Sequence, residues 1–470
     1  MGYLRGLRRG KLATWTALGA ALTCAGAMAA PGATRAQATR AQATPIRHVV
    51  VIYLENHSFD SLLGYWCDAH RGRCPDGGMP SSVRLSNGAV VTPRTDPDTV
   101  PVVNHTVAAQ RAAIDGGKMD GWQKIGGCTA ATGYRCISGY QPAQVPNITA
   151  LAQGFAISDR TFSLGDSPSW AGHMDLVAAS ADGFVGQIPA IQKGVPKGPG
   201  WGCDSNRVTP WLAPNGRTRQ VPSCVPSNQP GLPFGGAFKR TPVRNIPTIM
   251  DRLDEAGLSW KLYGATRNQQ GYVWSICPTF AECLDTNQDA NLVPDQQFLT
   301  AAAAGTLPAF SVVTPGGGFF TSSCHNSVSI TACDNWVGQL VGAVERSPDW
   351  SSTAVFLTWD DCGCFYDQVA PGTNPDGTSQ GPRVPMIIVS PFARPHFTDT
   401  TATTFTGILA FTEHNFELSP LGANDASAYP FSNAFDFGHR ALKPVRMVQR
   451  PLPASARHIH VTKELENDPT

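Results

Sequence analysis

The sequence predicts an α/β fold built on a mostly parallel central sheet. Residues 49–54 form an unbroken apolar run rich in β-branched side chains, and residues 354–359 form a second run of the same kind. Such runs are typical of strands that are buried on both faces of a parallel sheet. A helical pattern at residues 246–257 directly precedes a strand-like segment at 260–263, which is the alternation expected of an α/β protein.

The composition favours a large, loop-rich globular enzyme. The chain has 470 residues, of which 42% are hydrophobic, and this is enough for a large core or two modest domains. Only 15% are charged, whereas 47 glycines and 38 prolines are present. The formal net charge of +1 gives no reason to expect a nucleic-acid partner.

The first 45 residues are expected to lie outside the catalytic part. Residues 1–30 combine a basic segment with an Ala/Leu-rich run, as in a secretory signal peptide, and the run is too interrupted for a stable membrane span. Residues 31–45 contain a repeated Ala-Thr-Arg-Ala-Gln segment and are expected to be a disordered linker. We therefore expect a secreted, periplasmic or cell-envelope protein once the signal peptide is removed.

The cysteine pattern agrees with export. Of the 13 cysteines, Cys24 lies in the leader, and the even number that remains suits an oxidising compartment. They fall into close pairs along the chain, which makes local disulfides the simplest connectivity. The pairs are Cys67/Cys74, Cys128/Cys136, Cys203/Cys224, Cys277/Cys283, Cys324/Cys333 and Cys362/Cys364. For the last pair, two free thiols are the alternative, because a Cys-x-Cys bridge closes a strained ring.

Polar side chains follow both apolar runs at the point where each predicted strand ends. Glu55 and Asn56 follow the first run, and Asp360 and Asp361 follow the second. The ligand crevice of open α/β sheets lies beyond the carboxyl ends of the strands, and hard divalent cations prefer oxygen ligands. These four residues therefore form a candidate metal site. The alternative is that they cap turns and helices or pair with an arginine.

Ser169 is the candidate nucleophile, because the sequence takes on helical periodicity directly after it. A serine at a helix start can simply be an N-cap, but its hydroxyl also lies at the positive end of the helix dipole. A nearby metal ion would lower the pKa of that hydroxyl. His105 and His325 are candidates to donate a hydrogen bond to a phosphoryl oxygen or to protonate a leaving group.

Several motifs resemble, in the same order, those of the phosphoesterase family that holds bacterial phospholipases C and related acid phosphatases. The opening motif is Glu-Asn-His-Ser-Phe-Asp-Ser-Leu-Leu-Gly at residues 55–64. The other motifs are Gly-Lys-Met-Asp-Gly (117–121), Ser-Asp-Arg (158–160), Asp-Asn-Trp (334–336), Ser-Pro-Asp-Trp (347–350), Asp-Asp-Cys-Gly-Cys-Phe-Tyr-Asp (360–367) and Gly-Pro-Arg-Val-Pro (381–385). The resemblance implies an alkaline phosphatase-like α/β/α sandwich with loop-rich, disulfide-pinned insertions.

The resemblance also implies roles for the candidate residues. Glu55, Asn56, Asp360 and Asp361 would bind a divalent metal ion, and Ser169 would attack a phosphate ester of a small molecule or a lipid. His105 and His325 match histidines near the family's phosphate site. The resemblance covers residues 46–420, which we expect to be the catalytic domain. Within it, residues 186–245 are dense in Pro, Gly and Asn and are expected to form an insertion or lid, and the polar segment 421–470 is expected to be a C-terminal tail.

The sequence departs from the family pattern in ways that leave the substrate class open. Ala171-Gly172-His173 stands where the family has Pro-Asn-Arg, Cys364 replaces a glycine, and Gln368 replaces a histidine. The choice between phosphomonoesters and phospholipids therefore stays open.

Two other functions compete with this interpretation. A serine esterase of the Gly-Asp-Ser type would take its nucleophile from Gly165-Asp166-Ser167. The segment Gly422–Asp425 would be its oxyanion block, and Asp436–His439 its Asp-x-x-His motif. The spacing argues against it, because these last two segments are crowded together, and such short motifs recur by chance. The other competitor is a secreted binding protein with a decayed site.

Overall fold

The computed structural model describes residues 44–229, 242–316, 322–454 and 456. The predicted signal peptide (residues 1–30) and most of the predicted linker (31–45) lie outside the described residues. Within the described part of the chain, no helix is both long enough and apolar enough to cross a membrane.

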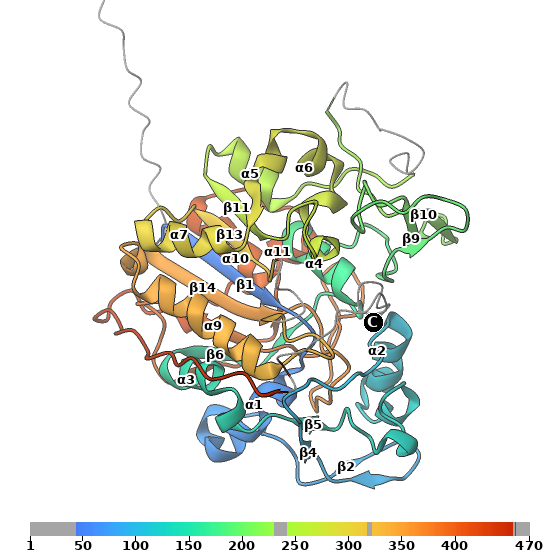
Figure 1. The fold of residues 1–470 in the computed structure, drawn as a ribbon, viewed down its shortest axis with the longest axis vertical. Helices are drawn as coiled ribbons and strands as arrows, with labels where there is room; N and C mark the ends of the chain where they lie inside the picture. The colour runs from blue at the N-terminus through green and yellow to red at the C-terminus, as the bar shows by residue number, and fades with distance from the viewer. Residues whose placement is uncertain (1–43, 230–241, 317–321, 455, 457–470) are drawn as a thin grey trace, which may run out of the picture. The chain divides into compact units, whose positions relative to one another are not determined.

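The centre of the fold is an eight-stranded sheet with the order β12-β11-β13-β1-β14-β15-β6-β16 (Figure 1). In that order, its strands are β12 (Leu292–Pro294), β11 (Trp260–Gly264), β13 (Phe310–Val313), β1 (His48–Leu54), β14 (Thr353–Trp359), β15 (Met386–Val389), β6 (Ala156–Ser158) and β16 (Phe397–Asp399). β15 runs antiparallel to both of its neighbours, and the other strand pairs of this sheet are parallel. The predicted mostly parallel sheet is confirmed.

The two apolar runs pair with each other in the middle of this sheet. β1 and β14 are parallel neighbours, and the register places His48 beside Thr353 at one end and Leu54 beside Trp359 at the other. Residues 49–54 and 354–359 are fully buried, which explains why both runs lack the alternation of a half-exposed strand. Because the two strands end side by side, the polar residues that follow them leave the sheet at the same edge.

Helices cover both faces of the sheet. The α-helices of the described residues are α1 (Phe59–Ala69), α2 (Val107–Ile114), α3 (Pro146–Gly154), α4 (Ser169–Ala178), α5 (Ile249–Glu255), α6 (Ala281–Asp285), α7 (Gln296–Ala304), α9 (Ile330–Glu345), α10 (Gly407–Phe416) and α11 (Ala423–Ala426). Phe298 of α7 packs edge-to-face on Tyr263 of β11, and Phe411 of α10 packs likewise on Phe356 of β14. Across the sheet, Tyr263 is aligned with Leu357, the residue after Phe356. Because side chains alternate along a strand, those of Tyr263 and Phe356 point to opposite faces of the sheet. The fold is therefore an α/β/α sandwich, with α7 and α9 in front of the strands in Figure 1.

The segment that we expected to be an insertion, residues 186–245, contains a small sheet of its own. Its strands are β8 (Ala190–Ile191), β9 (Arg207–Leu212) and β10 (Thr218–Pro222), paired antiparallel in the order β10-β9-β8. The composition of this segment did not reveal these strands, because prolines and glycines are frequent around them. Whether the segment acts as a lid stays a prediction.

Five of the six predicted cysteine pairs form disulfides, all between sequence neighbours. They are Cys67–Cys74, Cys128–Cys136, Cys203–Cys224, Cys277–Cys283 and Cys324–Cys333. Cys362 and Cys364 are buried free thiols. The backbone N–H of Cys364 lies 3.0 Å from Cys362 Sγ.

Part of the segment after residue 420 packs against the core. The rings of Phe431 and Phe435 lie 5.8 Å and 6.3 Å from that of Phe356 in β14. Both phenylalanines are buried, as are Asn424 and Asp425 in α11. The domain boundary at residue 420 stays a prediction, but the chain contributes to the core up to at least Phe435.

Candidate active site

Four of the predicted site residues meet at the ends of β1 and β14. Glu55, Asn56, Asp360 and Asp361 are all fully buried. The backbone N–H groups of Asn56 and Asp361 both donate to Asp360 Oδ1, over 2.9 Å and 2.8 Å. The adjacent ends of the two central strands therefore place three carboxyl groups and one carboxamide together.

The turn after β14 needs a glycine where it passes the end of β1. A Cβ atom on Gly363 would lie 2.3 Å from the carbonyl oxygen of Asn56, and Gly363 has a φ of +54°. The N–H of Gly363 donates to Asp361 Oδ1 over 2.6 Å and fixes that carboxyl group. The Asp-Asp-Cys-Gly sequence thus lets the two strand ends approach closely.

The side-chain amide of Asn56 links the acidic pair to a histidine. In the orientation that satisfies both ends of the amide, its nitrogen lies 3.2 Å from each carboxylate oxygen of Asp361. Its oxygen then accepts a hydrogen bond from His325 Nε2 over 3.1 Å. Asn56 has a φ of +63°, a left-handed conformation that asparagine tolerates better than most residues.

Ser169 is the first helical residue of α4, and its hydroxyl points into the same cluster. Pro168 takes the N-cap position, and Ser169 Oγ donates to Glu55 Oε2 over 2.7 Å. The alternative that Ser169 serves only as an N-cap is therefore wrong. Its hydroxyl donates to the carboxyl group of Glu55, whereas the hydroxyl of an N-cap serine accepts from a backbone N–H of the helix.

His173 is a member of the cluster that the sequence interpretation did not include. It lies one helical turn after Ser169, on the same face of α4, and its Nε2 lies 2.8 Å from Glu55 Oε1. Ligand atoms of Glu55, His173 and Asp360 all lie within 4.8 Å of one another. The available signal was the i, i+4 spacing from Ser169 to a histidine, which we had read only as a departure from the family motif.

The remaining two candidates lie beside this cluster. The rings of His105 and His325 are 6.1 Å apart in an edge-to-face arrangement, and both are buried. His105 Nδ1 faces the carbonyl oxygen of Val103 over 3.1 Å, and His325 Nδ1 faces that of Asn326 over 3.1 Å. All seven predicted site residues therefore gather at one edge of the sheet. Of the two histidines, His325 is the one that contacts Asn56 of the acidic group.

Burial and mutual repulsion make this a costly place for negative charge. Burial raises the pKa values of both Asp360 and Asp361 well above the usual range, and the charge of Glu55 adds to both shifts. Burial also acts to raise the pKa of Glu55, but the charge and hydrogen bond of His173 outweigh it and lower the value to about 2. Asp360 Oδ2 is buried and has no hydrogen-bond partner among the described residues. Such a donor set fits a divalent cation, which would offset the charge and engage the unpartnered oxygen.

The structure brings together only two of the three segments that the alternative serine esterase would need. Ser167 and Asn424 line one pocket of about 540 Å³, close to the start of α4. His439, however, contacts the carbonyl oxygens of Arg440 and Ala393, and Asp166 forms an ion pair with Arg111. Among the described residues, no hydrogen bond joins Ser167 to a histidine, so the geometry does not give Ser167 the histidine base of that esterase type.

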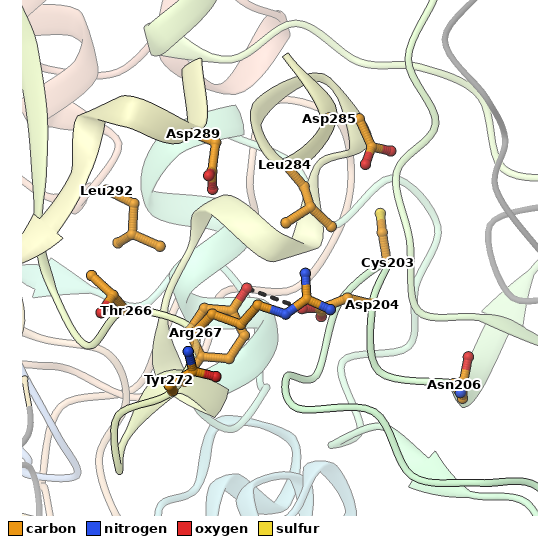
Figure 2. A pocket seen from close by; sticks show the side chains of 11 residues that line it. Cys203, Asp204, Asn206, Thr266, Arg267, Tyr272, Leu284, Asp285, Asp289 and Leu292 are labelled. Carbon is orange, nitrogen blue, oxygen red and sulfur yellow. Dashed lines mark hydrogen bonds between the residues drawn. The ribbon is translucent and has the colours of Figure 1, made fainter. Parts of the chain in front are cut away.

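A separate pocket is lined in part by Tyr272. The pocket has a volume of about 440 Å³. Figure 2 shows Asp204, Asp285, Asp289 and Arg267 among the side chains that line it. Tyr272, in the same 3₁₀ turn as Trp274, donates to Asp204 Oδ2 over 3.0 Å. None of the seven predicted site residues lines this pocket.

The fold and the cluster define an α/β protein in which acidic side chains and a helix-borne serine converge at the carboxyl ends of the central strands. The chain belongs to the Phosphoesterase family, whose family model matches residues 46–419. The family expected from the sequence motifs is confirmed.

Curated relatives are phospholipases. Non-specific phospholipase C6 of Arabidopsis thaliana is 24% identical over 76% of this chain and 64% of its own length. Phospholipase C B of Mycobacterium tuberculosis is 23% identical over 75% of this chain and 69% of its own length. A solved structure described as a protein in the alkaline phosphatase superfamily from Vibrio parahaemolyticus is 10% identical, with a TM-score of 0.36, over 82% of this chain and 71% of that one. The match with non-specific phospholipase C6 thus spans somewhat less than two thirds of the length of that plant protein.

Proposed function

We propose that this protein is an exported phosphoesterase that hydrolyses phosphoric ester bonds, with Ser169 as nucleophile and a divalent metal ion as cofactor. The observation that carries the proposal is the hydrogen bond from Ser169 Oγ to Glu55 Oε2, which holds a hydroxyl against the acidic cluster. Membership of the Phosphoesterase family and the phospholipase relatives support the reaction class.

Glu55, Asn56, Asp360 and Asp361 would hold the metal ion. Asp360 Oδ2 is unpartnered among the described residues, and the burial of two adjacent carboxyl groups is unfavourable unless a proton or a cation neutralises them. When bound, a divalent cation would lower the pKa of the serine hydroxyl and neutralise charge on the phosphoryl oxygens.

The residues of the chain would carry out a two-step displacement. Ser169 Oγ forms a bond to phosphorus while the bond from phosphorus to the ester oxygen breaks. Glu55 Oε2 accepts the hydrogen bond from the hydroxyl and orients it, and the hydroxyl proton, whose pKa a bound cation would lower, passes to water. His105 or His325 protonates the leaving alcohol or donates to a phosphoryl oxygen. Water then attacks the phosphoserine, which releases phosphate or a phosphorylated head group and restores the hydroxyl.

Export is supported by two independent features of the chain. The first 30 residues have the composition of a signal peptide, and five disulfides suit an oxidising compartment. N-terminal sequencing of the protein recovered outside the cytoplasm should begin after residue 30. Recovery of the intact leader on a cytoplasmic protein would contradict export.

A substrate panel tests the proposed reaction. Purified protein is incubated with p-nitrophenyl phosphate, p-nitrophenyl phosphorylcholine and phosphatidylcholine, before and after treatment with EDTA and after readdition of single divalent metals. We expect at least one ester to be hydrolysed, with loss in EDTA and recovery on adding metal. Hydrolysis of p-nitrophenyl acetate that EDTA leaves unchanged would instead favour the Ser167 esterase, whose pocket also contains Asn424. A protein that binds no metal and cleaves no ester would support the decayed binding protein.

A further inference from the structure

His173 is held between a carboxylate and a carbonyl oxygen. Its Nε2 lies 2.8 Å from Glu55 Oε1, and its Nδ1 lies 2.7 Å from the carbonyl oxygen of Trp274. Both His173 and Glu55 are buried. The edge of the Tyr53 ring also packs against the imidazole, with 5.1 Å between centroids, so the ring has one fixed orientation.

The contact with the carbonyl oxygen of Trp274 determines which ring nitrogen of His173 carries the proton in the neutral imidazole. A carbonyl oxygen only accepts hydrogen bonds, so Nδ1 must carry a proton to make this contact. In a neutral imidazole, Nε2 then has no proton and would point its lone pair at a carboxylate oxygen 2.8 Å away. That approach is repulsive unless a positive charge, either a second proton or a metal ion, lies at Nε2.

The surroundings of Nε2 favour the metal ion. A proton joins two atoms, and here three groups converge, because ligand atoms of Glu55, His173 and Asp360 lie within 4.8 Å of one another. Asp360 Oδ2 is buried without a hydrogen-bond partner among the described residues. A metal ion engages all three at once. A ring nitrogen that donates to a backbone carbonyl is also the usual support of a metal-binding histidine.

We infer that His173 Nε2 is a ligand of the same metal ion as Glu55 and Asp360, and that the carbonyl of Trp274 fixes the ring for this task. The inference rests on the proposed function, which supplies the metal ion. His173 stands where the related motif has arginine, so the ligand belongs to this chain's own sequence and not to the motif.

A nitrogen ligand changes which metal the site should prefer. Mg²⁺ and Ca²⁺ favour sites made only of oxygen ligands, whereas imidazole suits Zn²⁺ and other transition metals. With His173 added to the oxygen donors, we expect the site to select a transition metal such as Zn²⁺ over Mg²⁺ and Ca²⁺.

His48 offers a matched control for this inference. It too lies between a carbonyl and a carboxylate, with Nδ1 3.0 Å from Pro308 O and Nε2 3.7 Å from Asp349 Oδ1. It differs in lying at the opposite end of β1 from Glu55 and in facing the single carboxylate of Asp349, whereas ligand atoms of both Glu55 and Asp360 lie within 4.8 Å of one from His173. His48→Gln therefore removes a comparable imidazole that no metal ion should need.

The test is metal binding and X-ray absorption on the full, metal-stripped protein. We expect Zn²⁺-loaded wild type to show imidazole scattering. His173→Gln should lose that scattering and bind Zn²⁺ at least about tenfold more weakly. Its affinity for Mg²⁺ should change far less, and His48→Gln should behave as wild type. Circular dichroism confirms that both variants are folded.

The outcomes separate the inference from the proposed function. If wild type binds Zn²⁺ without imidazole scattering, or His173→Gln keeps the wild-type affinity and spectrum, His173 is not a ligand and the proposed function stands. A wild-type spectrum without imidazole scattering excludes His173 as a ligand even if the variant fails to fold. A wild type that binds no divalent metal overturns both the inference and the metal dependence.

Discussion

Ser169 Oγ donates a 2.7 Å hydrogen bond to Glu55 Oε2 across a sequence separation of 114 residues. Glu55 leaves the end of β1, and Ser169 opens α4, so the bond joins the central strand to the helix that covers its carboxyl end. The same carboxyl group contacts His173 through its other oxygen. Glu55 therefore positions the proposed nucleophile and is also a proposed metal ligand.

The acidic pair should be required for metal binding but not for folding. Asp361→Asn removes a charged ligand and also removes one of the buried carboxyl groups whose pKa values are raised by burial and by Glu55. We expect at least about tenfold less bound metal, with a melting temperature of the metal-free protein that stays level or rises. Elemental analysis and calorimetry measure the two quantities. Asp96→Asn, a buried acid elsewhere, should keep its metal. Full metal content in Asp361→Asn would contradict this role.

A buried ion pair holds the start of α1 and should matter far more for stability than a surface one. Arg383 is fully buried and binds Asp60 and Asp367, with N–O distances of 2.8 Å and 3.0 Å. Arg383→Ala leaves two carboxyl groups buried without their cation, which costs about 3–5 kcal/mol of unfolding free energy.

Arg160, which pairs with Asp76 at the surface, is the control for this measurement. Its side chain is 43% exposed, so Arg160→Ala should lower the free energy of unfolding by no more than about 1 kcal/mol. Denaturant titrations of both variants and of wild type measure these losses. Equal losses for the two variants would show that burial does not set the strength of these pairs.

The pair Glu413 and Asp425 should make stability depend on pH. Burial, helped by Asp425, raises the pKa of Glu413 from 4.5 to about 9. A raised pKa in the folded state means that Glu413 contributes its full stability below about 4.5 and loses it as the pH rises through about 9. Glu413→Gln mimics the protonated acid at every pH. Its melting temperature relative to wild type should therefore increase from pH 5 to pH 9, and parallel curves would rule out this assignment.

The strand ends could be predicted from the sequence because they depend on local patterns. Residues 49–54 and 354–359 are apolar throughout, as strands buried on both faces must be, and the polar residues after them mark where each strand stops. Two such strands in one parallel sheet place their carboxyl ends at the same edge. The helix that begins at Ser169 followed from the change in periodicity.

Other features depend on contacts that a sequence pattern does not encode. His173 joins the cluster only because the first two turns of α4 face Glu55. The carbonyl of Trp274, which orients the His173 ring, comes from a segment 101 residues away in the sequence. The buried position of Arg383 follows from two acids, Asp60 and Asp367, on separate segments. The strands of 186–245 were hidden by prolines, one of which, Pro210, lies inside β9 itself.

The most direct test of the account compares the two serines that lie two residues apart. Turnover of p-nitrophenyl phosphate, or of whichever ester the substrate panel identifies, is measured for wild type, Ser169→Ala and Ser167→Ala, each with and without EDTA. We predict that Ser169→Ala loses at least about 10³-fold in turnover, that Ser167→Ala keeps most of it, and that EDTA inhibits the wild type. If Ser167→Ala is the inactive variant and EDTA has no effect, Ser169 is not the nucleophile and the metal-dependent mechanism is wrong.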